Sequence, residues 1–318
     1  LHTLSGDWLS DPWFSYDDSD DGLEWTRLTT ACPSCGGSGR RACGCHVHQF
    51  NRPLAYIAFS IPYVRRQRAR LFRDLQQQST GAVVTEFSLT TSEAGYDVSG
   101  VNISSSALGA AAADSRALIW FQAGQHAWES GGRWASDGFA RFAASADGAT
   151  LLRHADVLVV PIMDIDNVVV GGAGKDSDPV DFNRDWCPLG GIARNETNAP
   201  CQHWKAIRAA VDTIRKAMES GRYSDLIFVD SHSPGNQNEA AQVWTACEKG
   251  PSAIEEGAWN RTQVYKSQLA IRSAACGRLA YNITDCAQVG PAYGNSNSGF
   301  HWMDISFINI LYTEFPAL

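Results

Sequence analysis

Short apolar runs alternate with longer amphipathic patterns from Leu54 onward, and this alternation constrains the fold more than any other feature. Apolar and β-branched runs predict strands at 55–60, 82–89, 95–103, 116–122, 156–162, 225–230 and 307–313. Helical periodicity predicts helices at 63–77, 129–145, 202–219 and 258–274. Because alternating strands and helices pack in layers, the sequence predicts an α/β fold with a mixed, mostly parallel central sheet and helices on both faces.

Residues 1–53 differ in character from the rest of the chain. They contain only short strand-like pieces separated by acidic and glycine-rich turns, and such pieces are too short to form a stable domain alone. We therefore predict two regions, a partial β-rich segment with a cysteine-rich insert at 1–53 and one large domain at 54–318.

The charge balance argues against nucleic acid as a partner. The 318 residues carry a net charge of -8 at neutral pH. Basic side chains cluster only on one predicted amphipathic helix, at Arg65, Arg66, Arg68, Arg70 and Arg73. We interpret this cluster as a solvated helix face. No run of about 18 apolar residues is present, so no membrane span is predicted.

Nine cysteines and four N-glycosylation sequons indicate an oxidising compartment. The sequons begin at Asn102, Asn195, Asn260 and Asn282, and none has proline in the middle position. The first residues lack the basic and apolar regions of a signal peptide. The sequence therefore predicts a secreted or lumenal protein whose signal has been removed.

Four of the cysteines crowd into one glycine-rich stretch: Cys32, Cys35, Cys43 and Cys45. These thiols, with His46 next to them, offer ligands for a structural zinc ion. In an oxidising compartment the same thiols form disulfides, and we favour this alternative. The connectivity of the nine cysteines stays open, because spacing along the chain does not determine it.

His126 and Glu129 lie three residues apart, where a predicted strand gives way to a predicted helix. Imidazole and carboxylate together suit zinc, and a catalytic zinc needs a third protein ligand and an open position for water. His232 follows the predicted strand at 225–230 and is the natural third ligand. The last predicted strand brings Glu314 to the same edge, where a carboxylate can take a proton from the water. We therefore predict one catalytic zinc site at the carboxyl ends of the strands.

Four segments, in their order and spacing, resemble the zinc carboxypeptidases of the carboxypeptidase A superfamily. They are His126-x-x-Glu129, Asp181-Phe-Asn183-Arg184, Asp230-Ser-His232 and Tyr312-Thr-Glu314. Two further pieces, 13–17 and 56–63, are similar to the β-sandwich end and domain junction of the cytosolic-carboxypeptidase-like branch. Relatives have a fuller sandwich before this chain and a further helix after it, so we expect the sequence to be a piece of a longer protein.

The resemblance implies a role for each residue of the zinc site. His126, Glu129 and His232 bind zinc, and Glu314 acts first as general base and then as general acid. Asp181 accepts a hydrogen bond from the outer nitrogen of His126 and fixes the tautomer of that imidazole.

The resemblance also implies residues that hold the substrate. Asn183 and Arg184 bind its terminal carboxylate, a task that suits the planar guanidinium fork. Family members carry an arginine about a dozen residues after an Asn-Pro-Asp-Gly turn, and the matching turn at 164–167 places Lys175 near that position. Lys175 can supply the charge without the fork. Tyr293, in a loop rich in glycine, proline and asparagine, matches the tyrosine that the family has before its final glutamate.

Three functions are compatible with these residues. The first is a zinc metallocarboxypeptidase that hydrolyses the C-terminal peptide bond of peptides or proteins. The second is an N-acyl amino acid deacylase of the same superfamily, which also recognises a free carboxylate. The third is a secreted binding or structural protein on this scaffold, without catalytic activity. The intact ligand set and Glu314 favour the first.

Overall fold

The computed structural model describes residues 13–16, 24–28, 47–58, 60–79, 81–106, 116–174, 180–185, 203–232, 243–245 and 305–307. In chain order its elements are β1 (Trp13–Ser15), β2 (Thr26–Arg27), β3 (Tyr56–Ala58), α1 (Arg65–Gln78), β4 (Ala82–Thr91), β5 (Asp97–Ser105), β6 (Arg116–Ala123), α2 (Ser130–Ala144), α3 (Ala149–Leu152), β7 (Ala155–Val160), α4 (Ile165–Val170), the 3₁₀ helix η1 (Phe182–Arg184), α5 (Lys205–Glu219), β8 (Tyr223–Ser231), β9 (Val243–Thr245) and β10 (Ile305–Phe307).

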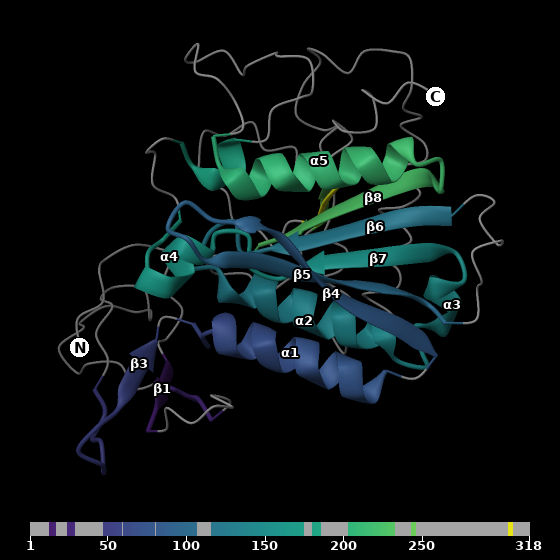
Figure 1. Ribbon diagram of the computed structural model, residues 1–318. Helices are drawn as coiled ribbons and strands as arrows, with labels where there is room; N and C mark the ends of the chain where they lie inside the picture. The colour runs from purple at the N-terminus through teal and green to yellow at the C-terminus, as the bar shows by residue number, and fades with distance from the viewer. Residues whose placement is uncertain are drawn as a thin grey trace.

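Five strands form a mixed sheet in the order β4-β5-β7-β6-β8 (Figure 1). β4 and β7 both pair with β5 in antiparallel fashion, while β7 and β8 both run parallel to β6. The three parallel strands therefore end at one edge of the sheet. The predicted mixed α/β sheet is confirmed, and in the described strands of this sheet parallel and antiparallel pairings are equal in number.

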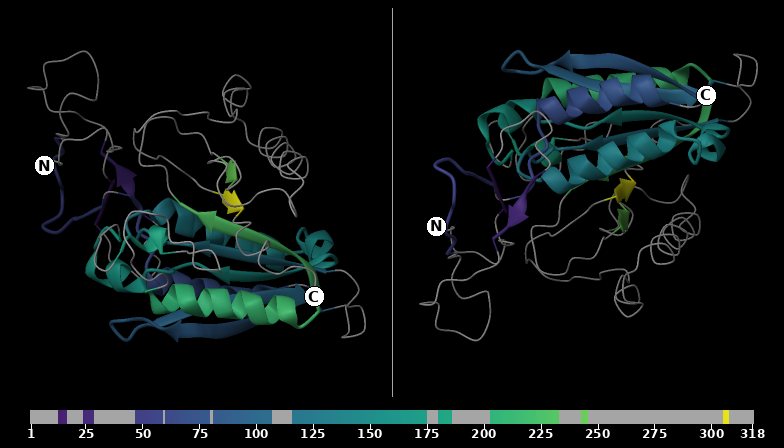
Figure 2. Two further views of the ribbon diagram at one scale, coloured as in Figure 1. Left: turned by 90° about the horizontal axis from the view of Figure 1, so that it is seen from above. Right: turned by 90° about the horizontal axis from the view of Figure 1, so that it is seen from below.

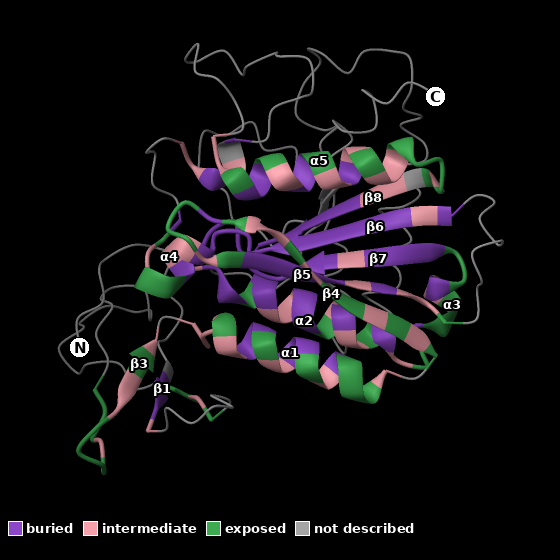
Figure 3. Cartoon of the chain, in the orientation of Figure 1, coloured by how far each residue is buried: buried purple, intermediate pink, exposed green. Residues whose placement is uncertain are grey.

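Helices cover both faces of this sheet and bury a separate core on each. On one face, α5 packs Ile207 and Ile214 against Trp120 of β6 and Phe228 of β8. On the other face lie α1 and α2, and the strands β6 and β7 are largely buried (Figure 3). That second core holds Leu71, Phe72 and Leu75 of α1 with Ile119, Phe121, Val157 and Val159 of the sheet. Strands buried on both faces explain the continuous apolar runs of β6 and β7.

Hydrogen bonds and backbone conformation at the helix ends explain where the helices begin and end. The backbone N–H of Val64 donates to the side chain of Gln67 at the start of α1. Asp164 precedes α4 and accepts from the backbone N–H of Asn167, and Gly171 ends this helix with a positive φ of 74°. The predicted helices at 63–77, 129–145 and 202–219 are confirmed to within a few residues, whereas 258–274 lies outside the described residues.

One detail of the basic cluster on α1 differs from the prediction. Arg68 is buried, with 8% of its surface exposed, and donates to the backbone carbonyl of Asp97. Arg65 and Arg73 are exposed, as expected for a solvated face. The long aliphatic stem of Arg68 lets it lie along the sheet while its guanidinium reaches a backbone acceptor.

A second, small sheet lies near one end of the main sheet (Figure 2). Its three antiparallel strands have the order β2-β1-β3, and β1 carries Phe14, which packs against Tyr16, His48 and Phe50. Further along the chain, β9 and β10 pair in parallel, and β10 lies beside β8. Within the described part of the chain, no helix has the length and hydropathy needed to cross a membrane.

Candidate metal centre

Two of the candidate ligands lie in one tight turn between β6 and α2. β6 ends at Ala123, and Gly124 then adopts a φ of +70°, which residues with a side chain rarely adopt. The backbone N–H of Glu129 donates to the carbonyl of His126 over 3.0 Å, and α2 begins at the next residue, Ser130. The turn thus holds both ligands at the carboxyl end of β6.

β8 brings the third candidate ligand beside this turn. Ser231 pairs with Ala123 at the ends of the parallel strands β8 and β6, and His232 follows directly. The first turn of α2 packs closely here, because a Cβ on Gly132 would lie 2.4 Å from the carbonyl oxygen of Ser231. Only glycine allows this approach, and the helix and β8 therefore bring Glu129 and His232 together.

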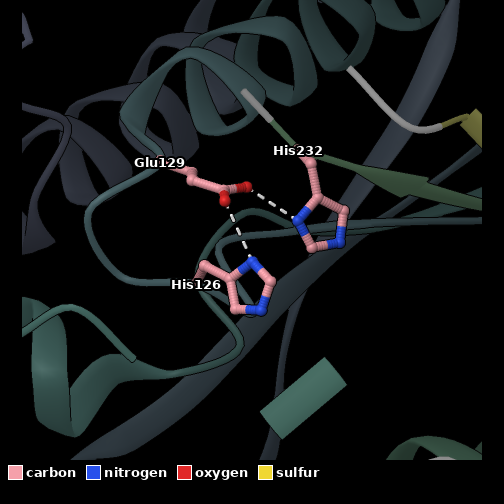
Figure 4. A group of neighbouring side chains, drawn as sticks. All are labelled: His126, Glu129 and His232. Atoms are coloured by element: carbon pink, nitrogen blue, oxygen red, sulfur yellow. Dashed lines mark hydrogen bonds and ion pairs between the residues drawn. The ribbon is translucent and has the colours of Figure 1, made fainter. Parts of the chain in front are cut away.

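The three side chains converge on one point (Figure 4). Nδ1 of His126 lies 3.0 Å from one carboxylate oxygen of Glu129, and Nδ1 of His232 lies 2.7 Å from the other. All three residues are buried, and one ligand atom from each lies within 4.8 Å of the others. Because zinc ligands at about 2.0–2.2 Å from the ion are roughly 3.5 Å apart, small side-chain shifts suffice to accommodate an ion.

The outer nitrogens of both histidines face carboxylates. Nε2 of His126 lies 3.1 Å from Oδ1 of Asp181, and Nε2 of His232 lies 2.8 Å from Oδ2 of Asp230. A carboxylate at Nε2 holds the proton there and leaves Nδ1 as the metal ligand. The donor set therefore fits one metal ion bound by two imidazole nitrogens and one carboxylate, with a position left for water.

Interactions within this cluster favour the charged forms of Glu129 and His232. Burial alone would raise the pKa of the Glu129 carboxyl, but hydrogen bonds from His126 and His232 hold this pKa well below its usual range. Burial would lower the pKa of the His232 imidazole, but Asp230 and Glu129 raise it well above its ordinary value. A metal ion at Nδ1 takes the place of a proton, so its binding releases protons and weakens at low pH.

The predicted substrate residues lie next to this cluster. Asp181 precedes η1, and its Oδ1 accepts from the backbone N–H of Asn183 over 2.9 Å as well as facing His126. Asn183 and Arg184 form the last two residues of η1. One carboxylate oxygen thus connects a metal ligand to the backbone of the predicted clamp for the substrate carboxylate.

Several predicted site residues lie outside the described residues. These are Lys175, Tyr293 and Glu314, all nine cysteines, and the sequons at Asn195, Asn260 and Asn282. Asn102 is described: it lies in β5 between two neighbouring strands, and its Oδ1 is buried. The roles of these residues therefore stay predictions.

Sequence reasoning assigned no role to several polar residues around the ligands. Asp230 contacts His232, Gln122 and Gln125, and Arg133 donates from α2 to the carbonyl of Ala127 within the ligand turn. For Asp230 the sequence held a signal, because residues two apart on a strand point to the same face. Nothing in the local sequence distinguishes Arg133 from a solvated helix residue.

Asp164 lies beside the ligand turn and is buried, with 3% of its surface exposed. Burial raises the pKa of its carboxyl to about 6, although hydrogen bonds from Asn167 favour the charged form. The ordinary pKa of this group is 3.8. Between pH 3.8 and about pH 6, the folded protein therefore keeps a proton on Asp164 that the unfolded chain releases. The contribution of Asp164 to the free energy of unfolding is thus fully present below about pH 4 and is lost as the pH rises through about 6.

Asp164→Asn is expected to stabilise the chelator-treated protein at pH 7.5 by about 1–3 kcal/mol, with little gain at pH 4.5. The amide is neutral at both pH values, and its oxygen still accepts from the backbone of Asn167. Urea unfolding at both pH values measures the difference. Asp147→Asn, at an exposed carboxylate, is the control and should shift stability equally at both. A gain at pH 7.5 no larger than that at pH 4.5 would contradict the prediction.

Comparison with known proteins identifies similar structures but no sequence relatives. No protein-family model matches the chain, and no curated protein matches it. A metallo-carboxypeptidase from Burkholderia cenocepacia superposes with a TM-score of 0.59 at 19% identity, covering 93% of this chain and 71% of its own. A metallo-carboxypeptidase from Pseudomonas aeruginosa has a TM-score of 0.57 at 20% identity, covering 95% and 72%.

Carboxypeptidase A from Helicoverpa armigera is also similar, with a TM-score of 0.50 at 16% identity, covering 70% of this chain and 55% of its own. Identities this low establish the architecture alone, so the superfamily and its branch stay predictions. The chain therefore has the fold seen in these metallo-carboxypeptidases.

Proposed function

We propose that the protein is a zinc-dependent metallocarboxypeptidase that hydrolyses the C-terminal peptide bond of peptides or proteins. One observation carries the proposal: His126, Glu129 and His232 converge at the carboxyl edge of a sheet with the metallo-carboxypeptidase fold. Zinc suits two imidazoles and one carboxylate with a fourth position open. The similar proteins from Burkholderia cenocepacia and Pseudomonas aeruginosa are themselves named metallo-carboxypeptidases.

When bound, zinc lowers the pKa of a water molecule and polarises the scissile carbonyl. The proposal assigns proton transfer, substrate binding and charge stabilisation to residues of the chain. Glu314 takes the proton from the attacking water and hands it to the leaving amine. Asn183 and Arg184 hold the free carboxylate of the substrate, which selects the last peptide bond. Lys175 supplies positive charge near the developing oxyanion.

Tyr293 is the remaining residue that we assign to the proposed site, through its match to the tyrosine that the family has before its final glutamate. Two contacts in the structure support this arrangement as a whole. Asp181 contacts His126 and accepts from the backbone N–H of Asn183, so one short segment would orient a metal ligand and position the clamp for the substrate carboxylate. β10, which ends seven residues before Glu314 in the sequence, lies beside β8, the strand that ends before His232.

A ladder assay tests the proposal. The zinc-loaded protein is incubated with a mixed peptide library, and mass spectrometry follows the loss of C-terminal residues. We expect stepwise shortening that a chelator stops, zinc restores and Glu314→Gln abolishes. Acylated amino acids are assayed in parallel. Hydrolysis of these without any peptide shortening would favour the deacylase, and zinc binding without either activity would overturn the enzymatic proposal.

We also propose that the protein is secreted or lumenal. The four sequons and nine cysteines of the sequence support this location. Peptide mapping of protein from a secreting host is expected to find glycan on Asn195, Asn260 or Asn282. An unmodified protein with nine free thiols would contradict the proposal.

A further inference from the structure

A buried row of polar side chains leads to the outer nitrogen of His232. Asp230 and His232 lie two residues apart on one face of β8 and its continuation, and Oδ2 of Asp230 lies 2.8 Å from Nε2 of His232. The same oxygen accepts from the side-chain amide of Gln125. Across the parallel strand pair, Gln122 is the register partner of Asp230 and donates to its Oδ1 over 3.4 Å.

The direction of these hydrogen bonds follows from Trp120. Its indole N–H can only donate, and it donates to the side-chain oxygen of Gln122 over 2.9 Å. The amide nitrogen of Gln122 must then point to Asp230, which accepts at both of its oxygens. His232 therefore meets an acceptor at Nε2, so the proton on Nε2 stays in place, and the proton on Nδ1, which faces Glu129, is the one that a metal ion would replace.

Water cannot replace these hydrogen-bond partners, because the side chains are buried. The exposed fractions of Trp120, Gln122 and Gln125 are 0%, and that of Asp230 is 2%. By contrast, 22% of the Asp181 side chain, the partner of His126, is exposed. The orientation of His232 thus depends entirely on protein groups, whereas Asp181 is partly accessible to solvent.

We propose that Asp230, held in place by Gln122 and Gln125, is a positioning residue that keeps the His232 proton on Nε2 and leaves Nδ1 free to bind the metal. This inference rests on the metal site of the proposed function. It assigns Asp230 no contact with the metal or the substrate. Its effect is on metal affinity through the tautomer of one ligand.

Two double variants of equal charge separate this role from packing. In Asp230→Asn with Gln122→Glu, the new glutamate accepts from Trp120 and from the new amide at position 230, which turns the oxygen of that amide toward His232. In Asp230→Asn with Gln125→Glu, the new glutamate draws the amide nitrogen to the side that faces His232, and the proton must move to Nδ1. Each variant exchanges one carboxylate and one amide between neighbouring positions.

Zinc affinity is measured by competition with a chelating dye, and folding by thermal unfolding. We expect the variant with Gln122→Glu to bind zinc within a few-fold of the unmutated protein. The variant with Gln125→Glu is expected to bind about 10- to 100-fold more weakly, the loss typical when the partner of a metal ligand is disturbed. Equal affinities of the two variants would overturn the inference.

Long-range proton–nitrogen NMR of the imidazole gives a readout that packing alone would not move, and it needs no variant. In the unmutated, zinc-loaded protein, His232 should show a proton on Nε2 that exchanges slowly with water. A proton on Nδ1, or fast exchange, would overturn the inference even if a variant fails to fold. Failure of the unmutated protein to bind zinc would overturn the proposed function and this inference together, whereas zinc binding with equal variants overturns this inference alone.

Discussion

His232→Ala is expected to weaken zinc binding by about 100-fold or more. Zinc sites in proteins contribute roughly 10–16 kcal/mol in total, so one of a few ligands accounts for about 3 kcal/mol or more. His232 is also the only one of the three ligands that comes from a separate strand, 103 residues after Glu129. Without it, only the ligands of one turn remain. Competition with a chelating dye at pH 7.5 measures the change.

The matched control is His203→Ala. His203 likewise faces a buried carboxylate, with Nδ1 2.8 Å from Oδ1 of Asp185, but it is not one of the three metal ligands. Zinc affinity of this variant should stay within about two-fold of the unmutated protein. Comparable zinc affinity of His232→Ala and His203→Ala would show that the ion binds elsewhere, and the metal centre would have to be abandoned.

Asp156→Ala is expected to lower the free energy of unfolding by about 3–5 kcal/mol. Asp156 lies near the amino ends of the parallel strands, at the edge opposite the metal site, and is 1% exposed. Its Oδ1 accepts from Arg116, which is 5% exposed, over 2.6 Å. Arg116 also donates to backbone carbonyls at 152, 153 and 155. Removing the carboxylate would leave this guanidinium buried without a counter-charge.

The other oxygen of Asp156 has two partners of its own. Arg222 donates to it over 2.6 Å and the hydroxyl of Tyr223 over 2.9 Å. Burial, followed by the hydrogen bond and charge of Asp156, raises the pKa of Tyr223 to about 12, so the phenol remains a donor across the working pH range. Asp156→Ala therefore leaves three donors without their acceptor.

Two further variants separate charge burial from simple contact loss, each followed by urea unfolding. Arg222→Ala removes an ion pair whose arginine side chain is 54% exposed and should cost under about 1 kcal/mol. Arg116→Met with Asp156→Leu removes both buried charges and should recover most of the stability that Asp156→Ala loses. A loss for Asp156→Ala no larger than for Arg222→Ala would refute the prediction. Zinc affinity should not change in any of these variants.

Local periodicity predicted most of the described elements of the main sheet because each depends on neighbours in the chain. The runs that became β4, β5, β6, β7 and β8 were found to within about two residues, as were the main parts of α1 and α2. Short elements such as α3 and α4 were missed, since four to six residues carry too few periods to detect. Arg68 was assigned to solvent because periodicity does not show that a backbone acceptor lies within its reach.

The candidate site likewise combines features that are local in the sequence with features that depend on the tertiary fold. The identities of His126, Glu129 and His232, and the place of each just past a strand, follow from the sequence alone, since a strand end and a turn are local features. Their convergence required the strand order β7-β6-β8, which places the ends of β6 and β8 side by side. Sequence periodicity does not encode that order, because strand neighbours are chosen by packing across the whole sheet.

Which nitrogen of each histidine faces Glu129 at the candidate metal centre was decided only by the tertiary structure. The sequence, through its family resemblance, proposed Asp181 for His126, and the structure shows the two 3.1 Å apart. For His232, the partner Asp230 lies two residues away on the same face, and only the tertiary structure shows that Gln122 of β6 lies beside that carboxylate and donates to it. The sequence by itself determined the candidate ligands and the fold class, because both rest on residue type and local period. The tertiary structure decided their hydrogen-bond directions, because these depend on buried partners that are distant in the chain.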